Sequence, residues 1–447
     1  MCANSDDAGR TFPELIELGW YRAVRGVKTV GFPGIRDRRT VASLSVVEIM
    51  RQEKWLDKPY YSLDAYMKYT YGQKVYKIAV DAGLTCPNRD GTLGEHGCIF
   101  CSAGGSGDFA VPITGGSRQT VHSAAAGHAG ADVAAVDGCV YEHRSKRDSR
   151  GASTEVYHKE YERRGSCVDV ERKTLDIKRQ MERGMAKFHK KVGEKFVIYF
   201  QAYTNTYGDP AYLERIWREA LEEESVVGIS IATRPDCLGI PGVSVAVKKA
   251  EMAAVENQSG NAETVISILG RLQKEYAESG KFIWIELGLQ TMHEATAEYI
   301  RRGYLLSTYE TAIQALADNH IPYITHVILG LPGETEDDML ATVRYVCGQQ
   351  AKPFGIKLQL LHVLRGTDLC GDYEAGSFEV LSQDEYIELV IKCLEVIPED
   401  IVIHRVTGDG PKNILVAPLW SGNKRQVLNT LHQKMKIEKR EQGTWAK

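Results

Sequence analysis

The chain has 447 residues, 43% of them hydrophobic, and a formal net charge of −4. This length supplies a large apolar core, while the near-neutral charge does not indicate the basic surface typical of nucleic-acid-binding proteins. No run approaches the ~20 apolar residues of a membrane span, and the first residues lack the pattern of a secretory signal, so we expect a cytoplasmic protein without a membrane partner.

Residues 1–60 are expected to form an N-terminal extension, ahead of a core that spans residues 61–400. Six apolar runs within the core are predicted as strands: Val75–Val80, Phe196–Phe200, Val226–Ile231, Phe282–Leu287, Tyr323–Leu329 and Ile356–Leu361. Their nearly continuous apolar character is typical of parallel strands covered on both faces. Because helical patterns alternate with them, we predict an α/β fold, specifically an open partial (β/α)6 TIM-type barrel. Residues 401–447 are predicted to be a C-terminal extension that packs on the core.

The starts of the intervening helices carry recognisable signals. Asp209 and Pro210 are predicted as an N-cap and a first helical residue, a position where the missing N–H of proline needs no partner. Further predictions are capping boxes of Ser307 with Glu310 and of Ser382 with Glu385, a helix start at Thr335, and a helix over Ala262–Ser279. Two stretches, about 104–172 and 241–261, break the alternation and are predicted as insertions, since long aperiodic loops are rare inside a compact core.

Three cysteines, Cys86, Cys98 and Cys101, lie on one glycine-rich loop directly after the first predicted strand. Functional groups of parallel β/α folds gather where strands end, so this loop is placed for a site. A structural zinc or an ordinary four-iron cluster takes four protein ligands, whereas three thiolates leave one coordination position open. Two alternatives are a partial zinc site completed by His96 or a distant cysteine, and a set of buried thiols. The other cysteines are scattered, which is typical of a reducing compartment.

Polar and glycine-containing motifs follow the other predicted strands. They are Tyr199–Thr206, Thr233–Asp236, Glu286–Thr291, Gly330–Thr335, Leu360–Val363 with Arg365–Thr367, and His404–Asp409. Together with the cysteine loop, they resemble the radical S-adenosylmethionine (SAM) enzymes, and the wide first cysteine spacing resembles their Elongator-protein-3-like branch. A narrower similarity, to the bacterial YhcC-like radical SAM proteins, is carried by Tyr199–Thr206, Leu360–Val363 and His404–Asp409. Matches at several strand ends are more specific than any single motif.

The resemblance implies a cofactor and a reaction. Cys86, Cys98 and Cys101 would each bind one iron of a 4Fe-4S cluster, with SAM on the fourth iron. A one-electron reductant of flavodoxin or ferredoxin type would then allow SAM to yield a 5′-deoxyadenosyl radical that abstracts hydrogen from an unidentified substrate. RNA is one candidate substrate by analogy with the Elongator-like branch, and a small metabolite or a peptide suits the neutral charge equally well.

Further site residues are placed by the same analogy. The residues implied to contact SAM are Gln201, Thr204, Glu286, Gln290, Ile328, Gly330 and Pro332. The residues implied in catalysis are Arg234, Asp236, His362 and Arg365. Arg234 and Asp236 also suit a structural ion pair, and His362 and His404 also suit a packed core. A second functional class stays open: a non-catalytic iron–sulfur or zinc-binding protein with a redox or interaction role.

Overall fold

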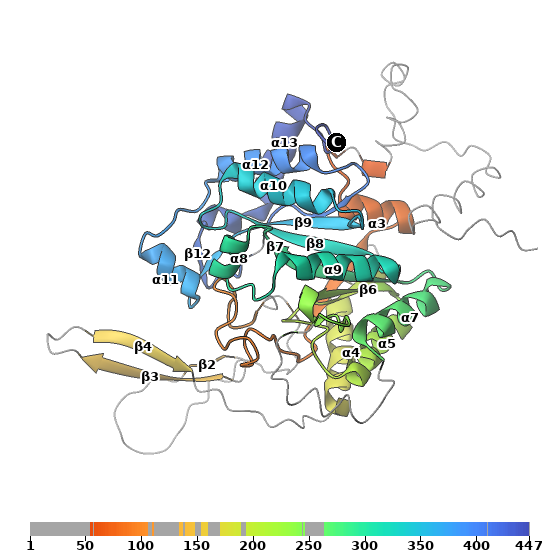
Figure 1. Cartoon of the computed structure of the whole chain (residues 1–447), viewed down its shortest axis with the longest axis horizontal. Helices are drawn as coiled ribbons and strands as arrows, with labels where there is room; N and C mark the ends of the chain where they lie inside the picture. The colour runs from red at the N-terminus through yellow and green to blue at the C-terminus, as the bar shows by residue number, and fades with distance from the viewer. Residues whose placement is uncertain are drawn as a thin grey trace, which may run out of the picture.

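Seven parallel strands form one curved, open sheet in the order β1-β5-β6-β7-β8-β9-β11 (Figure 1). The computed structural model describes residues 54–56, 58–105, 110, 134–136, 139–147, 153–159, 170–188, 194–243, 245, 263–408 and 410–446. The strands are β1 (Val75–Val80), β5 (Lys195–Phe200), β6 (Val226–Thr233), β7 (Phe282–Gln290), β8 (Tyr323–Leu329), β9 (Gly355–Leu360) and β11 (Val402–Arg405). The predicted partial α/β barrel is confirmed, with one strand more than predicted. The additional strand, β11, pairs with the edge strand β9.

Helices alternate with these strands in the described part of the chain. They are α3 (Leu63–Tyr71), α4 (Val170–Ala186), α5 (Pro210–Glu222), α7 (Val265–Ala277), α8 (Glu294–Tyr299), α9 (Leu306–Asp318), α10 (Glu336–Cys347), α11 (Asp368–Glu374), α12 (Gln383–Val396) and α13 (Lys424–Glu438), with short 3-10 turns η2 (Pro235–Cys237) and η3 (Leu419–Gly422). Two short strands, β10 (Val363–Leu364) and β12 (Leu415–Ala417), form a separate antiparallel pair. None of the described helices is long and apolar enough to cross a membrane.

Three of the four predicted helix starts are confirmed. The Asp209 carboxylate accepts a hydrogen bond from the backbone of Tyr212 at the start of α5, and Thr335 and Ser382 cap α10 and α12 within capping boxes. The predicted capping box of Ser307 with Glu310 is wrong. Helix α9 begins two residues earlier than a cap at Ser307 would place it, at Leu306, whose N–H donates to the Glu294 side chain at 2.6 Å. A tertiary contact thus replaces the local cap. The helix predicted over Ala262–Ser279 is the shorter α7.

Side chains of the sheet alternate between two environments. Outward residues such as Ile283 and Ile285 of β7 pack with the covering helices in the main hydrophobic core. Inward residues of the same strand, Phe282 and Trp284, belong to a separate apolar cluster with Met67 of α3. Because strand side chains alternate in direction, each strand contributes to both faces. The concave interior, which we call the lumen, therefore has its own side-chain layers.

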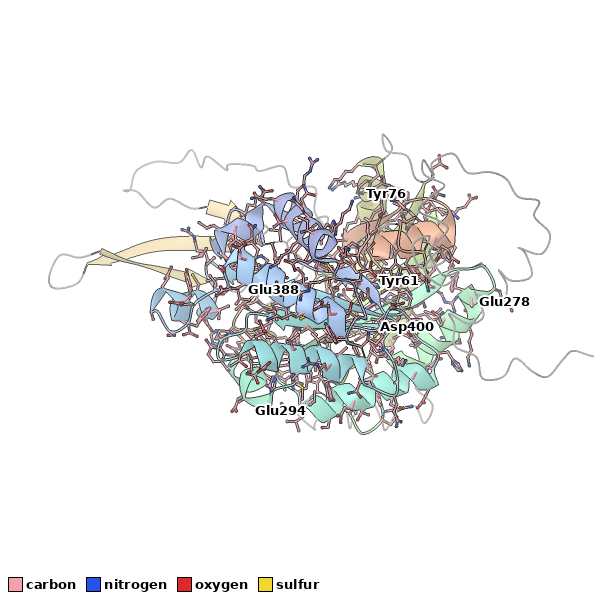
Figure 2. The ribbon with its side chains drawn as sticks, turned by 90° about the horizontal axis from the view of Figure 1, so that it is seen from above. Tyr61, Tyr76, Glu278, Glu294, Glu388 and Asp400 are labelled. Atoms are coloured by element: carbon pink, nitrogen blue, oxygen red, sulfur yellow. The ribbon has the colours of Figure 1, made fainter. Side chains whose placement is uncertain are left out.

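The two edges of the open sheet are linked by the chain's own ends. Helix α3 contacts both edge strands, β1 and β11. The backbone N–H of Ile403 in β11 donates to the carbonyl of Tyr61 at 2.8 Å, and Figure 2 shows Tyr61 beside the turn at Asp400 that leads into β11. On the outer side, Glu388 of α12 pairs with Arg440, just beyond α13. The segment after residue 400 thus supplies both a strand and a covering helix.

Part of the longer predicted insertion contains regular structure. Three antiparallel strands, β2 (Ala134–Val136), β3 (Cys139–Arg147) and β4 (Ser153–Lys159), form a small sheet of their own. Figure 1 shows it extending away from the seven-stranded sheet. The composition of this stretch did not indicate strands. Most of the second predicted insertion, 241–261, lies outside the described residues.

Candidate functional site

The cysteine loop, residues 86–101, is folded by its own backbone. The Cys86 carbonyl accepts hydrogen bonds from the N–H groups of Arg89 and Asp90 at 2.8 and 3.2 Å, and the Asn88 carbonyl accepts from Gly97 at 2.7 Å. Gly97 has a φ of +75°, and a Cβ there would lie 2.7 Å from the Arg89 guanidinium. A larger residue is therefore excluded twice, by backbone conformation and by contact. These bonds return the loop on itself after β1.

The loop brings the sulfur atoms toward one another and toward hydrogen-bond donors. The Asn88 side chain donates to Cys98 Sγ at 3.4 Å and to the Arg301 carbonyl at 2.7 Å. A hydrogen bond from Cys101, and then the positive charge of Arg234, lower the pKa of Cys98 to about 6. The same pairing, together with burial, raises the pKa of Cys101. These contacts favour the thiolate form of Cys98, which is the form that binds metal.

A fourth cysteine, Cys237 of η2, lies near enough to Cys86 for the two to interact electrostatically. Its Sγ donates to the carboxylate of Asp236 at 3.6 Å, and burial raises its pKa well above the usual value. Among the described residues, no three histidine, cysteine or carboxylate side chains converge as the ligands of a single metal ion. This holds for the three loop cysteines as well as for a zinc site with His96, so the metal assignment of the loop rests on its donor set.

Arg234 and Asp236 are paired with each other behind the cysteine loop. Two guanidinium nitrogens of Arg234 bond the two carboxylate oxygens of Asp236 at 2.9 and 2.7 Å, and a third bonds the Arg302 carbonyl at 2.9 Å. Burial opposes the charge of Arg234, but the bonds to Asp236 outweigh it and raise its pKa. Both side chains are buried. This geometry favours the structural ion pair, which also keeps a positive charge near Cys98.

The segment after β5 meets the cysteine loop. The N–H of Thr204 donates to the carbonyl of Thr85 at 3.2 Å, and the Tyr203 hydroxyl donates to the Ala103 carbonyl at 2.8 Å. Gln201 bonds through its N–H to Val80, the last residue of β1. Asn205 is fully buried, and its side-chain oxygen has no hydrogen-bond partner among the described residues. An unsatisfied buried acceptor is rare in proteins and points to a missing donor at this position.

The two residues predicted on β7 have different surroundings. Glu286 is fully buried, and its carboxylate already accepts bonds from four protein side chains, those of Lys77, Ser230, His326 and Lys357. Gln290 ends the strand with a φ of +71°, and its buried side-chain oxygen has no partner within the described structure. The geometry thus favours Gln290 over Glu286 as a ligand contact, because only Gln290 has an acceptor to offer.

Ile328 lies in an apolar cluster above the end of β8. It packs with Ile99 of the cysteine loop and Leu331, in the same cluster as α11 and the β10–β12 pair. Gly330 follows with a φ of +88°, its N–H directed to Met339 Sδ at 3.0 Å, and Pro332 continues the turn into α10. Of these three residues predicted to contact SAM, Ile328 therefore packs against the cysteine loop.

His362 and Arg365 lie farther along the same edge. The His362 ring is within 3.1 Å of the Ser421 hydroxyl, and Gly408 and Gly410 approach it closely. The Arg365 side chain is exposed, and its N–H bonds the Ile414 carbonyl at 2.7 Å. Asp409 lies outside the described residues. The catalytic role of His362 and Arg365 stays a prediction.

The sequence prediction missed a polar layer in the lumen, which we call the lumen ring. Each of the seven strands contributes one member: Lys77, Tyr199, Ser230, Glu286, His326, Lys357 and His404. Contacts converge on the Glu286 carboxylate, with Ser230 at 2.6 Å and His326 at 2.9 Å. Both lysines lie over the Tyr199 ring, at 4.0 and 4.6 Å from its centre. The sequence does contain a signal for this layer, namely charged residues within otherwise apolar strands.

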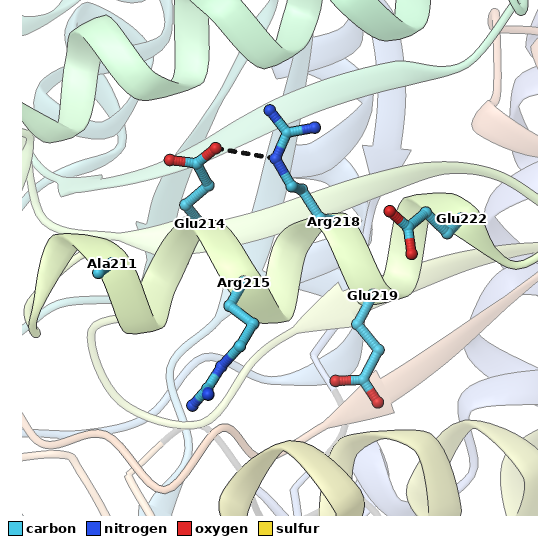
Figure 3. Close-up of a pocket in the computed structure, with 6 residues that line it drawn as sticks. All are labelled: Ala211, Glu214, Arg215, Arg218, Glu219 and Glu222. Carbon is cyan, nitrogen blue, oxygen red and sulfur yellow. Dashed lines mark hydrogen bonds and ion pairs between the residues drawn. The ribbon is translucent and has the colours of Figure 1, made fainter. Parts of the chain in front are cut away.

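Two surface hollows are lined by residues outside the cysteine loop. One is lined by a single helix, α5, with Glu214 bonded to Arg218 in Figure 3. Burial raises the pKa of Glu219 in this hollow to about 7. Another hollow is basic, and its lining includes Lys412, Lys424 and Arg425. The α5 hollow is on the outer, helical face of the sheet, so we do not assign it to the site at the strand ends.

Two curated proteins are similar over most of their length. "Uncharacterized protein YtqA" of Bacillus subtilis is 34% identical over 388 residues, which cover 87% of this chain and 92% of that protein. "Protein YhcC" of Escherichia coli is 26% identical over 354 residues, with 79% of this chain and 85% of that protein covered. A shorter similarity, 26% over 144 residues, joins 32% of this chain to 26% of mouse "Elongator complex protein 3".

Two family models match consecutive parts of the chain. The model described as "Radical SAM superfamily" matches residues 161–346, and the "Radical_SAM C-terminal domain" matches residues 353–437. The first match contains β5 to β8 and begins after the cysteine loop. The second contains β9, β11 and most of α13, so β11 lies within the matched region and not in an unrelated appendage.

Proposed function

The chain belongs to the radical SAM superfamily, in the YhcC-like branch related to Elongator protein 3, and we propose that its cysteine loop binds a 4Fe-4S cluster through Cys86, Cys98 and Cys101. The family uses such a cluster together with SAM, and the protein is accordingly a radical SAM enzyme. The observation that carries the proposal is the donor set: three thiols on one loop, with amide and guanidinium groups that favour a thiolate.

The residues of the chain have separate proposed roles. Cys86, Cys98 and Cys101 would hold the cluster, which together with SAM would supply radical hydrogen-abstraction chemistry. Asn88 donates to Cys98 Sγ, which stabilises the thiolate. Arg234, held by Asp236, keeps positive charge beside the same sulfur. Such contacts to ligand sulfur tune a cluster's reduction potential.

SAM is proposed to lie between the loop and the strand ends. Gln290 and Asn205 have buried oxygens without partners in the described chain, which suits the amino and hydroxyl donors of SAM. Gln201 and Thr204 are on the segment that contains Asn205. Ile328, Gly330 and Pro332 are proposed as the apolar wall for the adenine, since Ile328 packs with Ile99 of the loop. Glu286 is proposed to act from the lumen ring instead of contacting SAM.

The test is anaerobic reconstitution with iron and sulfide, followed by reduction in the presence of SAM and chromatography for 5′-deoxyadenosine. We expect cluster absorbance and 5′-deoxyadenosine from the wild type. Cys98→Ala should lose both, whereas Cys347→Ala, which removes a buried thiol of α10, should keep both. Full iron content in a variant lacking all three loop cysteines would refute the ligand assignment. A loaded protein that never cleaves SAM would instead be the non-catalytic iron–sulfur protein.

Two partners, an electron donor and a substrate, are proposed by their chemical class. Radical SAM enzymes need an electron donor, and we propose one of flavodoxin or ferredoxin type. RNA is one candidate substrate, because the hollow lined by Lys412, Lys424 and Arg425 offers positive charge to phosphates. Binding of labelled tRNA that falls steeply with salt and is lost when the three side chains become alanine would support it. Unchanged binding in that variant would contradict this site.

A further inference from the structure

The lumen ring occupies a middle layer of the half-barrel. Below it, Trp284 and Phe354 belong to an apolar cluster that α3 covers. Trp284 and Phe354 both lie against the His404 ring, at centre distances of 5.3 and 5.7 Å. Above it are the strand ends and the cysteine loop. The ring is therefore the polar layer between that apolar cluster and the strand ends where SAM is proposed to bind.

Two lysines share one carboxylate in this layer. Lys77 and Lys357 both reach the carboxylate of Glu286. Burial lowers the pKa of both lysines, that of Lys357 to about 7, although Glu286 favours their charged forms. An anion bound beside the two ammonium groups would favour their charged forms further.

His404 provides an independent observation. Both of its ring nitrogens are buried, and neither has a hydrogen-bond partner among the described residues. A neutral imidazole carries one donor and one acceptor, and leaving both unsatisfied in the interior is unfavourable. The His404 imidazole belongs to the His404–Asp409 motif, which the proposed cluster chemistry does not use. A polar group that enters the lumen from solvent would satisfy it.

The lysines are also accessible from the lumen. The Lys77 side chain retains 25% of its exposure and Lys357 retains 9%, whereas Glu286 between them has none. His326 retains 13%, so Lys77 is the most exposed of the side chains that contact Glu286. An incoming group can therefore reach the Lys77 ammonium, whereas the carboxylate is shielded.

We propose that the lumen ring binds an anionic oxygen group of the substrate, a phosphate or a carboxylate, through Lys77, Lys357 and His404. This inference rests on the proposed function, because it takes the lumen as the substrate chamber. The ammonium groups supply charge-assisted hydrogen bonds and the imidazole supplies its N–H. The substrate would then be held by its charged end, with its remaining atoms directed toward the cysteine loop.

Isothermal titration calorimetry of the full chain without cluster tests the proposal, with inorganic phosphate and acetate as separate probes. We expect at least one probe to bind the wild type, and the stronger one identifies the group. His404→Leu removes both ring nitrogens without orphaning a partner, and Lys77→Met leaves Glu286 paired with Lys357. Each should weaken binding by about tenfold or more. Lys392→Met, which removes an exposed lysine paired with Glu336, should not change it.

The remaining outcomes separate this inference from the proposed function. Cys98→Ala should bind the probe like the wild type, because the ring does not include the cysteine loop. Equal binding by His404→Leu and the wild type, or no binding of either probe to the wild type, would overturn the anion site. If SAM displaces the probe from the reconstituted enzyme, the site belongs to the SAM carboxylate and the substrate assignment is wrong. Simultaneous binding of SAM and the probe supports it.

Discussion

At the scale of single residues, the described structure places its most perturbed titratable groups in the lumen. Glu286 is held ionised there because Lys357 and Lys77 outweigh the cost of its burial, so its pKa is well below the usual value. His326 is held neutral, since burial lowers its pKa to about 4. Perturbed groups of this kind are typical of functional sites, although structural networks also produce them.

The lowered pKa of His326 predicts how the free energy of unfolding depends on pH. Between its unfolded pKa of 6.5 and its folded pKa of about 4, the unfolded chain binds a proton that the folded protein does not. Its contribution is therefore complete above pH 6.5 and declines as the pH falls, by about 3 kcal/mol in total. Urea unfolding at pH 7 and pH 5 measures this. His326→Asn should show a smaller difference between the two pH values, and an identical difference would contradict the assignment.

At the scale of elements, helix starts in this protein are fixed either by local caps or by tertiary donors. Ser382 accepts a hydrogen bond from the Glu385 backbone in a complete capping box at α12. Helix α9 has no side-chain cap, and Glu294 satisfies its first donor from another helix. The two sequences look alike, with Ser followed three residues later by Glu, but only one is a box.

This difference gives a paired prediction. Ser382→Ala should lower the free energy of unfolding by about 1 kcal/mol, because it removes an N-cap acceptor. Ser307→Ala should change it by less than about 0.5 kcal/mol, because that hydroxyl caps nothing in α9. Chemical denaturation of the two variants beside the wild type makes the comparison. Equal losses would mean that α9 is capped in solution in the way its sequence indicated.

At the scale of the whole molecule, the open sheet depends on contacts between segments distant in sequence. Gln442 is 1% exposed. Its side chain accepts from the Tyr61 N–H at 2.9 Å and donates to the carbonyls of Pro398 and Ile401 at 2.7 and 2.9 Å. One side chain thus joins the segment before α3, the turn before β11 and the segment after α13.

Replacing this side chain should weaken the closure of the sheet edge. Gln442→Met keeps the volume but removes three side-chain hydrogen bonds to backbone groups. Because the Pro398 carbonyl still accepts from the Ile401 N–H, we expect a loss of about 2 kcal/mol in the free energy of unfolding. Gln314→Met, which removes an exposed bond to Asp318 on α9, serves as the control and should be near neutral. Denaturation midpoints decide between them. A Gln442→Met midpoint equal to that of the control would show that these ends contribute little to stability.

Local patterns in the sequence were sufficient for much of the fold and for the proposed metal ligands. Runs of apolar residues predicted six of the seven sheet strands, because parallel strands covered on both faces need such runs. The spacing of Cys86, Cys98 and Cys101 on one loop after a strand placed them together, because a short loop keeps its residues close. Strand β11 was missed because it has only four residues, two of them His404 and Arg405.

Only the tertiary structure revealed the lumen ring and the pairing of Arg234 with Asp236. The members of the ring are spread from Lys77 to His404, and they meet because the register of seven strands turns one polar residue of each toward the same interior. No local pattern encodes such a register. Likewise, the sequence showed that Glu286 begins a motif at the end of a predicted strand. Its burial among two lysines, a serine and a histidine, which only the structure shows, decides what its carboxylate contacts.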